Sequence, residues 1–425
     1  MTTPTTLREI SCADDYDPAS MPVDKARALI RKFLAPVTAV ERVHLRDALD
    51  RVLATDVISP RDVPGHDNSA MDGWAVRFAD LAPEGETPLA RVGESFAGRP
   101  FSSALGGGEA VRIFTGGVMP EGADTVVMQE RATEVEGGVR VHAGAVARIG
   151  QNRRRAGEDV RRGAVVFAAG QPLRPAELGM LASLGVNEVS VYRRLRVAFF
   201  STGDELRSIG QPLGPGEIYD SNRYTLLGML RRIHCDPIDM GVVRDDPGAL
   251  EQALATAAGC ADVVITSGGV SVGEADFVKD VLDRLGDVLF WKIAMKPGRP
   301  LAYGRIGNAH FFGLPGNPVA VMVTFYEFVR DALHVLQGRS DASALPAFRA
   351  VLSAPVRKMR GRTEFQRGIL ARGDDGEWRV SSTGDQGSGI LSSMSRANCF
   401  IVLPVDVDHV DAGAEVNVQP FEGIV

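Results

Sequence analysis

The sequence predicts a multi-domain protein of mixed α/β and β class, built around a three-layer α/β/α domain. Three observations support this prediction. The chain has 425 residues, more than one hydrophobic core usually serves. Apolar runs of strand length alternate with helically spaced stretches across residues 195–336, which indicates β–α units around a parallel sheet. Glycine-rich segments with short alternating runs stand on both sides of this region, as is typical of β modules.

The N-terminal part predicts a discontinuous helical linker domain. Helical spacing covers residues 23–34, a short strand follows at 40–45, and a second helix is expected at 47–53. A third helix, residues 175–184, has Pro175 at its start and Gly185 at its end, and we expect it to pack back on the first two. Residues 21–60 and 160–192 would then form one domain, interrupted by an inserted β-rich module at 61–159.

Residues 193–337 form the expected α/β domain. Strands are predicted at 197–201, 237–243 and 263–266, and helices at 224–233, 247–258 and 276–285. Two more strands, 300–303 and 310–314, precede a helix that begins near Pro318, where the missing N–H is harmless. Ligands bind outside the carboxyl ends of such strands, so the loops 202–206, 267–276, 296–300 and 314–318 are expected to share one edge. The remaining residues, 338–425, predict a small C-terminal β domain that resembles a barrel.

Composition narrows the classes of function. The net charge of −7, from 47 basic and 54 acidic residues, argues against a nucleic-acid-binding surface. No apolar run approaches the length of a membrane span, and the N-terminal residues lack a signal-peptide pattern. The four cysteines are widely separated and make no metal-binding pair, which fits a reducing cytoplasm.

Glycine-containing turns indicate an anion site. The turn Pro315-Gly316-Asn317-Pro318 joins a strand to a helix, and such a turn offers free backbone N–H groups and the positive helix end. Lys296 and Arg299 add positive charge from a neighbouring loop. Ser267-Gly268-Gly269 predicts a nest of backbone donors for a phosphate or a heterocycle. The alternative is that these loops are only tight connections.

Acidic residues at loop and strand-end positions predict a magnesium site, because Mg²⁺ prefers oxygen ligands. Each of them taken singly could instead be a helix cap or a solvated turn. Either Asp245 or Asp246 is expected to cap the helix at 247–258, with Asp245 preferred. The sequence has no P-loop, dinucleotide or nucleophile-elbow motif. The residues therefore predict an enzyme that binds a phosphorylated anion with a divalent cation. The acidic candidates are Asp72, Asp159, Asp204, Glu205, Asp245, Asp246, Glu274 and Asp276.

Six ordered motifs resemble those of the molybdopterin molybdotransferase family, which includes bacterial MoeA and the E domain of gephyrin. They are DNSAMDGWA, FTGGVMPEGADTVVMQE, STGDEL, TSGGVSVGEADF, AMKPGRPLAYG and FFGLPGNPVAV. The resemblance runs from about Val23 to Pro420. It implies a homodimer of four-domain subunits that inserts molybdate into adenylylated molybdopterin, with magnesium present, and releases AMP and molybdenum cofactor. The α/β domain would be the molybdopterin-binding domain.

The resemblance also implies roles for individual residues. The catalytic set is Asp72, Thr115, Asp159, Glu205, Asp246 and Asp276, in a site formed across the dimer. Magnesium would be held by Asp246, Glu274 and Asp276. The pocket for nucleotide and oxyanion would use Ser267, Gly268, Gly269, Lys296, Gly298, Arg299, Pro315, Gly316, Asn317, Arg362 and Ser388. Two positions depart from the family pattern: Arg299 stands where relatives often have lysine, and Ala320 where some have serine.

Other functions remain open at this stage. The same α/β domain could serve the adenylyltransferase that precedes this step, or a CinA-like nucleotide hydrolase. Tungstate could be the preferred oxyanion. A scaffold role, as in the gephyrin E domain, would leave the acidic positions neutral to mutation. The upstream adenylyltransferase is an expected partner.

Overall fold

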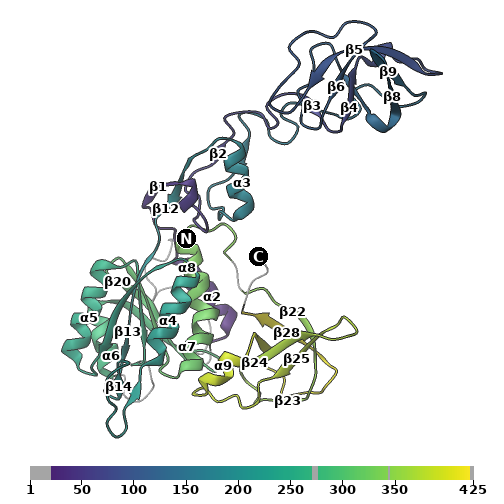
Figure 1. The fold of residues 1–425 in the computed structure, drawn as a ribbon. Coiled ribbons are helices and arrows are strands. Elements are labelled where there is room, and N and C mark those ends of the chain that lie inside the picture. The colour runs from purple at the N-terminus through teal and green to yellow at the C-terminus, as the bar shows by residue number, and fades with distance from the viewer. Residues whose placement is uncertain (1–20, 270–275, 343–344, 422–425) are drawn as a thin grey trace, which may run out of the picture. The chain divides into compact units, whose positions relative to one another are not determined.

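The structure is a computed structural model that describes residues 21–269, 276–342 and 345–421 (Figure 1). Contacts divide it into two units. One unit comprises residues 42–49 and 53–190, and the other holds the rest of the described chain. The contacts resolve two units, so the finer division into four domains stays a prediction.

The first unit contains the predicted β-rich module. Its six-stranded sheet has the order β7-β4-β6-β5-β9-β8. Alternation along β4 places Trp74 in one hydrophobic cluster and Ala75 in another, so that both faces of the sheet are covered. The strands are β4 (Gly73–Val76), β5 (Thr87–Ser95), β6 (Glu109–Ile113), β7 (Thr125–Met128), β8 (Ala132–Val135) and β9 (Gly138–Val141).

Two short antiparallel pairs show that the module is an insertion. Strand β2 (Val57–Ile58) pairs with β11 (Val165–Phe167), and β3 (Asn68–Ser69) pairs with β10 (Arg153–Arg154). The chain therefore enters and leaves the module along neighbouring paths. Helix α3 (Pro175–Ser183) follows, with Pro175 in its first turn and Gly185 just past its end at φ +77°.

The helix predicted at residues 47–53 is wrong. A 3₁₀ turn, η1 (Leu45–Asp47), ends there, and Asp50 has φ +59°, which no α-helix accommodates. Residues 52 and 53 are extended and bond to Tyr192 and Gln171. The predicted packing of α3 on the first helix stays a prediction, because the two helices belong to different units. Helix α2 (Val23–Lys32) belongs to the second unit, where Arg27 donates to the Glu327 carbonyl at 2.8 Å.

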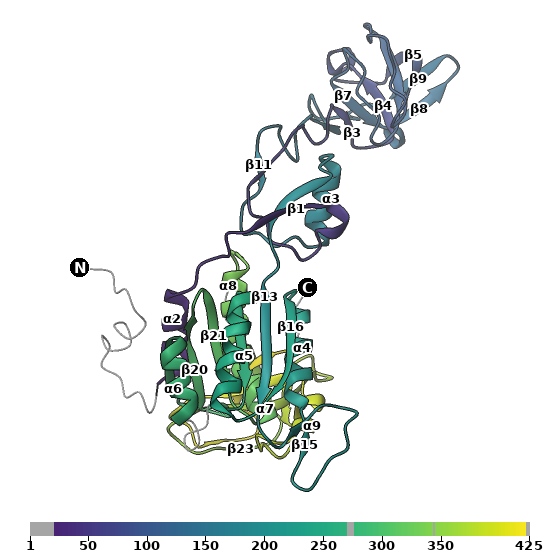
Figure 2. The same cartoon turned by 90° about the vertical axis from the view of Figure 1, so that its left-hand side faces the viewer.

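The second unit contains the α/β domain, whose six-stranded sheet has the order β16-β13-β17-β21-β20-β18 (Figure 2). The sheet is mixed, whereas the sequence predicted a parallel one. Strand β20 is antiparallel to both neighbours, because only Gly307 and Asn308 separate it from β21, and a two-residue loop joins antiparallel strands. The strands are β13 (Arg196–Thr202), β16 (Asp236–Val243), β17 (Val263–Ser267), β18 (Gly286–Lys292), β20 (Pro300–Ile306) and β21 (Ala309–Leu314).

Helices cover both faces of this sheet and give the predicted three layers. Val197 and Phe199 of β13 pack in the cluster of helices α4 and α2, whereas Ala198 and Phe200 pack against α5 and α6. The predicted helix after Pro318 is α7, a π segment and α8 in succession. The helices are α4 (Ser221–Arg232), α5 (Pro247–Cys260), α6 (Asp276–Leu285), α7 (Pro318–Thr324), the π segment (Phe325–Val329) and α8 (Arg330–Leu336).

The strand directions place the functional loops at one edge, as predicted. Strands β13, β17 and β21 are parallel and end at this edge. Strand β20 runs in the opposite direction and begins there. The loop at 296–300 therefore joins the others even though it precedes a strand.

The C-terminal region is a closed β-barrel, which confirms the predicted barrel. Five strands follow the order β24-β25-β22-β28-β26, and pairing of β24 with β26 closes the ring. Strand β19 (Met295–Lys296) of the α/β domain adds to β24 in parallel. No helix in the described part of the chain has the length and apolar character needed to cross a membrane. The barrel elements are β22 (Phe348–Leu352), β24 (Thr363–Arg372), β25 (Trp378–Ser382), α9 (Leu391–Arg396), β26 (Cys399–Leu403) and β28 (Glu415–Pro420).

Candidate functional site

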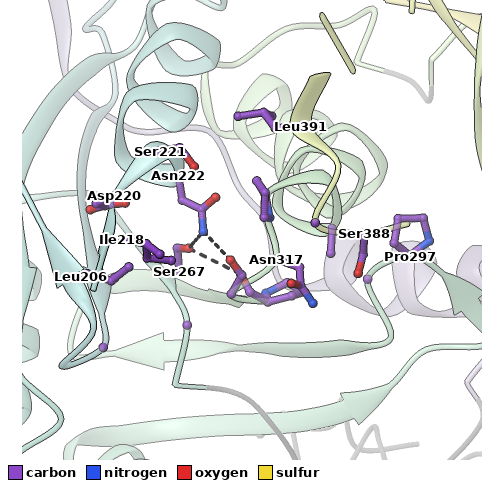
Figure 3. Close-up of a pocket in the computed structure, with 18 of the residues that line it drawn as sticks. Leu206, Ile218, Asp220, Ser221, Asn222, Ser267, Pro297, Asn317, Ser388 and Leu391 are labelled. Atoms are coloured by element: carbon purple, nitrogen blue, oxygen red, sulfur yellow. Dashed lines mark hydrogen bonds between the residues drawn. The ribbon is translucent and has the colours of Figure 1, made fainter. Parts of the chain in front are cut away.

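A pocket of about 1110 Å³ opens at the loop edge of the α/β sheet (Figure 3). It is lined by the ends of β13, β17 and β21, the start of α4, the loop before β20 and barrel residues 385–389. The predicted residues that line it are Glu205, Ser267, Gly268, Gly269, Lys296, Gly298, Pro315, Gly316, Asn317 and Ser388.

Two glycines after β17 form the predicted turn. Gly268 has φ +90° and Gly269 has φ +69°, a region that favours glycine. A Cβ atom at Gly268 would lie 2.6 Å from the Thr202 carbonyl oxygen, so the close approach of the two strand ends also requires glycine. Successive backbone N–H groups in such a turn create a concavity for anions.

Asn222 connects the two glycine turns, a role that was not predicted from the sequence. Its Nδ2 donates to Ser267 Oγ at 2.8 Å and to the Gly316 carbonyl at 2.6 Å, as Figure 3 shows. Asn222 is buried in the first turn of α4, which Asp220 caps by accepting from the Arg223 N–H at 3.2 Å. The capping pattern Asp-Ser-Asn before an apolar stretch was the available signal.

The Pro315–Pro318 turn begins α7 as predicted, with Pro318 in its first turn. One of the helix-start N–H groups is already engaged, since Val319 N donates to the Ser388 carbonyl at 3.1 Å. That bond brings the barrel to the turn and places Ser388 on the pocket wall. The turn therefore offers fewer free donors than the sequence suggested.

Lys296 is held by a carboxylate of the barrel. Its Nζ lies 3.2 Å from Glu364 Oε1, and Lys296 stands opposite Glu364 in the β19–β24 register. Glu364 is buried and also accepts from Gln366 Nε2 at 3.2 Å. Gly298 in the same loop has φ +94°, and a Cβ atom there would lie 2.5 Å from Thr324 Oγ1. The loop is thus attached to the barrel on one side and packed against α7 on the other.

Arg299 and Arg362 were predicted to bind the oxyanion, but neither is among the described residues that line the pocket. The backbone carbonyl of Arg299 accepts from Ile293 N at 2.6 Å. The carbonyl of Arg362 accepts from Lys358 Nζ at 2.9 Å. Their assignment to the oxyanion site stays a prediction.

The acidic residues separate into groups. Glu205 and Asp245 line the main pocket, while Asp204, Asp245 and Asp246 line an adjoining cavity of about 760 Å³. Asp246 is the cap of α5, accepting from Ala249 N at 2.8 Å, so the preference for Asp245 as the cap was wrong. A cap accepts from the second or third backbone N–H of the helix, and Asp246 directly precedes Pro247.

The predicted metal ligands are only partly described. Asp276 begins α6, but its side chain lies outside the described part, as does the whole of Glu274. Within the described ranges no three His, Cys, Asp or Glu residues converge on a metal position. The predicted magnesium ligands therefore stay a prediction.

Asp72 and Thr115 contact each other in the first unit. Asp72 Oδ1 accepts from the Thr115 N–H and from Thr115 Oγ1, each at 2.7 Å. These bonds, the backbone one first, lower the pKa of the exposed Asp72 carboxyl below its usual range. In the same unit the backbone N–H of Asp159 donates to the Val63 carbonyl at 3.0 Å. The side chains of Asp72 and Thr115, which were predicted from separate motifs, are therefore hydrogen-bonded to each other.

Comparison with known proteins covers most of the chain. Residues 21–185 match the family model described as MoeA N-terminal region (domain I and II). Residues 198–335 match the probable molybdopterin binding domain, and 349–421 the MoeA C-terminal region (domain IV).

Relatives and solved structures are similar over nearly their whole length. The chain is 46% identical to the molybdopterin molybdenumtransferase of Haemophilus influenzae over 403 residues, 95% of this chain and 99% of that protein. It is 39% identical to the protein of the same name from a Nostoc species, over 88% of this chain and 87% of the relative. A crystal structure of the molybdopterin biosynthesis moeA protein from Pyrococcus horikoshii OT3 superimposes with a TM-score of 0.81 at 30% identity. It covers 95% of this chain and 100% of the other.

Proposed function

The chain belongs to the MoeA family of molybdopterin molybdenumtransferases, and we propose that its pocket joins molybdate to adenylylated molybdopterin and releases AMP. The observation that supports this location is the convergence of two glycine turns with Lys296 and Ser388 on one pocket. The turns suit a phosphate, and the lysine and hydroxyl suit a second anion.

Different residues of the pocket would bind the phosphate and the oxyanion. The backbone N–H of Gly269 would bind the phosphate of the nucleotide, because the N–H of Gly268 already donates to the Leu314 carbonyl at 3.1 Å. Lys296, which also pairs with Glu364, would donate an N–H to the molybdate oxyanion, and Ser388 would donate its hydroxyl to it. Together they would hold the molybdenum substrate next to the dithiolate of the pterin, so that transfer becomes an intramolecular event. Magnesium is expected from the family resemblance, and we assign no step to it.

We propose that the protein acts as a homodimer in the cytoplasm and receives its nucleotide from the upstream adenylyltransferase. The family resemblance implies a two-subunit site, and the predicted catalytic residues fall in both units of the chain. Asp72, Thr115 and Asp159 belong to the first unit, and Glu205 and Asp246 to the second. In this proposal the acidic loops of one copy serve the pocket of the other.

The test is AMP release from adenylylated molybdopterin by purified protein, with and without molybdate. Release that depends on molybdate and yields active cofactor supports the proposal. Rescue of nitrate reductase activity in a cofactor-deficient host at low molybdate is the cellular counterpart. Release at the same rate without molybdate would instead indicate a nucleotide hydrolase, and competition with tungstate would measure the preference between oxyanions.

A further inference from the structure

The loop between β13 and α4 carries apolar side chains into the pocket. Residues 203–220 separate these elements, a longer connection than the two to six residues usual in α/β units. Two short strands, β14 (Leu206–Arg207) and β15 (Ile218–Tyr219), pair in parallel inside it. Long loops that keep their own order are often functional.

The loop is braced by its own hydrogen bonds. The Glu217 carboxylate accepts from Gly214 N at 2.8 Å and pairs with Arg207. The Tyr219 hydroxyl donates to the Gln211 carbonyl at 2.9 Å. These bonds fix the positions of the side chains that the loop presents, which lowers the ordering cost when a ligand binds.

Leu206 and Ile218 form a small apolar surface at one end of the pocket. They stand directly opposite in the β14–β15 register, so both side chains lie on the same face. Ile218 is 55% exposed, although a side chain of this size is usually buried. Figure 3 shows both side chains near Ser267, at the opposite end of the pocket from Ser388 and Pro297. Together with Tyr219 they supply all the large apolar side chains of the described pocket lining except Leu391.

We propose that this surface, Leu206 with Ile218, binds the flat face of a nitrogen heterocycle. The inference rests on the proposed function, which supplies two such rings, adenine and pterin. The phosphate would lie on the glycine turns beside Ser267, and the ring attached to it would cover the apolar surface. Aromatic rings bury much apolar area, so they suit a surface made by the half-buried Leu206 and the exposed Ile218.

The experiment is calorimetric titration of the full chain with AMP, neopterin and inorganic phosphate. Wild type is compared with Ile218→Ser and Leu206→Ser. Each variant should bind at least one of the two ring-bearing ligands about tenfold more weakly, because the contact of an aliphatic side chain with the ring is lost. Inorganic phosphate should bind as before. The ligand that weakens identifies the ring.

The matched control is Ile209→Ser, since Ile209 is 61% exposed on the same loop and does not line either cavity. It should leave all affinities unchanged. If both pocket variants bind the ring-bearing ligands as tightly as wild type, the inference is wrong but the proposed function is not affected. The same holds if Ile209→Ser loses as much affinity as the pocket variants. Failure of wild type to bind either ring would overturn the inference together with the nucleotide substrate. Thermal unfolding of each variant verifies that it is folded.

Discussion

At the scale of single residues, Asp72 and Thr115 show what motif reading can and cannot find. Each lies in a motif that the sequence shows, but the two residues are 43 positions apart in the chain. Their contact depends on the pairing of β4 with β6, because Asp72 directly precedes β4 and Thr115 lies just after β6. The bond keeps Asp72 ionised at lower pH than an ordinary aspartate.

We predict that Thr115→Val raises the pKa of Asp72 toward its ordinary value. The backbone bond remains, so the change should be partial. Because the depressed pKa keeps the carboxylate charged as pH falls, the variant should acquire its proton at a higher pH. Carbon-13 NMR titration of the carboxyl measures this directly. The Thr133 hydroxyl contacts His142 instead, so Thr133→Val should leave the pKa of Asp72 unchanged. An unchanged pKa in Thr115→Val would show that the hydroxyl bond is unimportant.

Asn222 gives a second prediction at this scale. Asn222→Ala leaves Ser267 Oγ and the Gly316 carbonyl without their shared donor. We expect the variant to lose about 1 to 3 kcal/mol of stability, since buried polar groups lose a partner. Urea denaturation measures the loss. The Thr225 hydroxyl on the same helix donates to the Ser221 carbonyl, and its loss in Thr225→Ala should cost under about 1 kcal/mol. Equal stability of wild type and Asn222→Ala would contradict the bridging role.

At the scale of elements, the sequence predicted most helices and central strands, because their apolar periodicity reflects local burial. It did not predict the direction of β20, which depends on the two-residue turn at Gly307 and Asn308. It also missed the attachment of β19 to the barrel. Both features depend on pairing partners, and the partner of β19 lies far along the chain. The candidate pocket was predicted through its glycine turns and Lys296, whereas its apolar end and Asn222 were not predicted.

The β19–β24 attachment carries a prediction about Lys296 and Glu364. Lys296→Met should destabilise the protein by about 1 to 3 kcal/mol, because it removes the cation that is paired with a buried carboxylate. Adding Glu364→Gln should restore part of the stability. Urea denaturation of wild type, Lys296→Met, Glu364→Gln and the double variant gives the coupling energy. Cofactor formation should stay low in the double variant, because the lysine is still missing.

An exposed pair on the same barrel is the control. Arg349 and Glu415 are 3.2 Å apart and both largely exposed, so their coupling should be below about 1 kcal/mol. A coupling at the Lys296–Glu364 pair no larger than that of the control would show that the attachment does not depend on this charge pair.

At the scale of the whole molecule, buried histidines connect stability to pH. Burial first, and then Arg305, lower the pKa of His310 to about 4, and its Nδ1 lies 3.4 Å from the Tyr303 hydroxyl. Below the ordinary pKa of 6.5 the unfolded chain binds a proton that the folded chain does not. The contribution of His310 to the stability is therefore fully present above pH 6.5 and is lost as the pH falls toward 4. We predict a contribution of about 2 kcal/mol to the loss between pH 7 and pH 5.

Urea denaturation of wild type and His310→Gln across this range tests the assignment. The variant should lose most of that contribution, while His66→Gln, at an exposed histidine, should retain it. His334, whose pKa burial first and then the charges of Arg339 and Arg330 lower to about 3, would leave a remaining pH dependence of the same sign. The same pH dependence in wild type and His310→Gln would exclude His310 as a source.

The proposed homodimer makes the largest-scale prediction. If the acidic loop of one copy completes the pocket of the other, Asp72→Asn and Glu205→Gln alter different contributors to each site. Either variant alone should be inactive. When the two are co-expressed, half of the dimers are mixed, and each mixed dimer has one intact site of two, so about a quarter of wild-type activity should return. A site built within one chain would contain one altered residue in every copy. Molybdate-dependent AMP release from the co-expressed pair, with each single variant as control, therefore separates a shared site from a self-contained one.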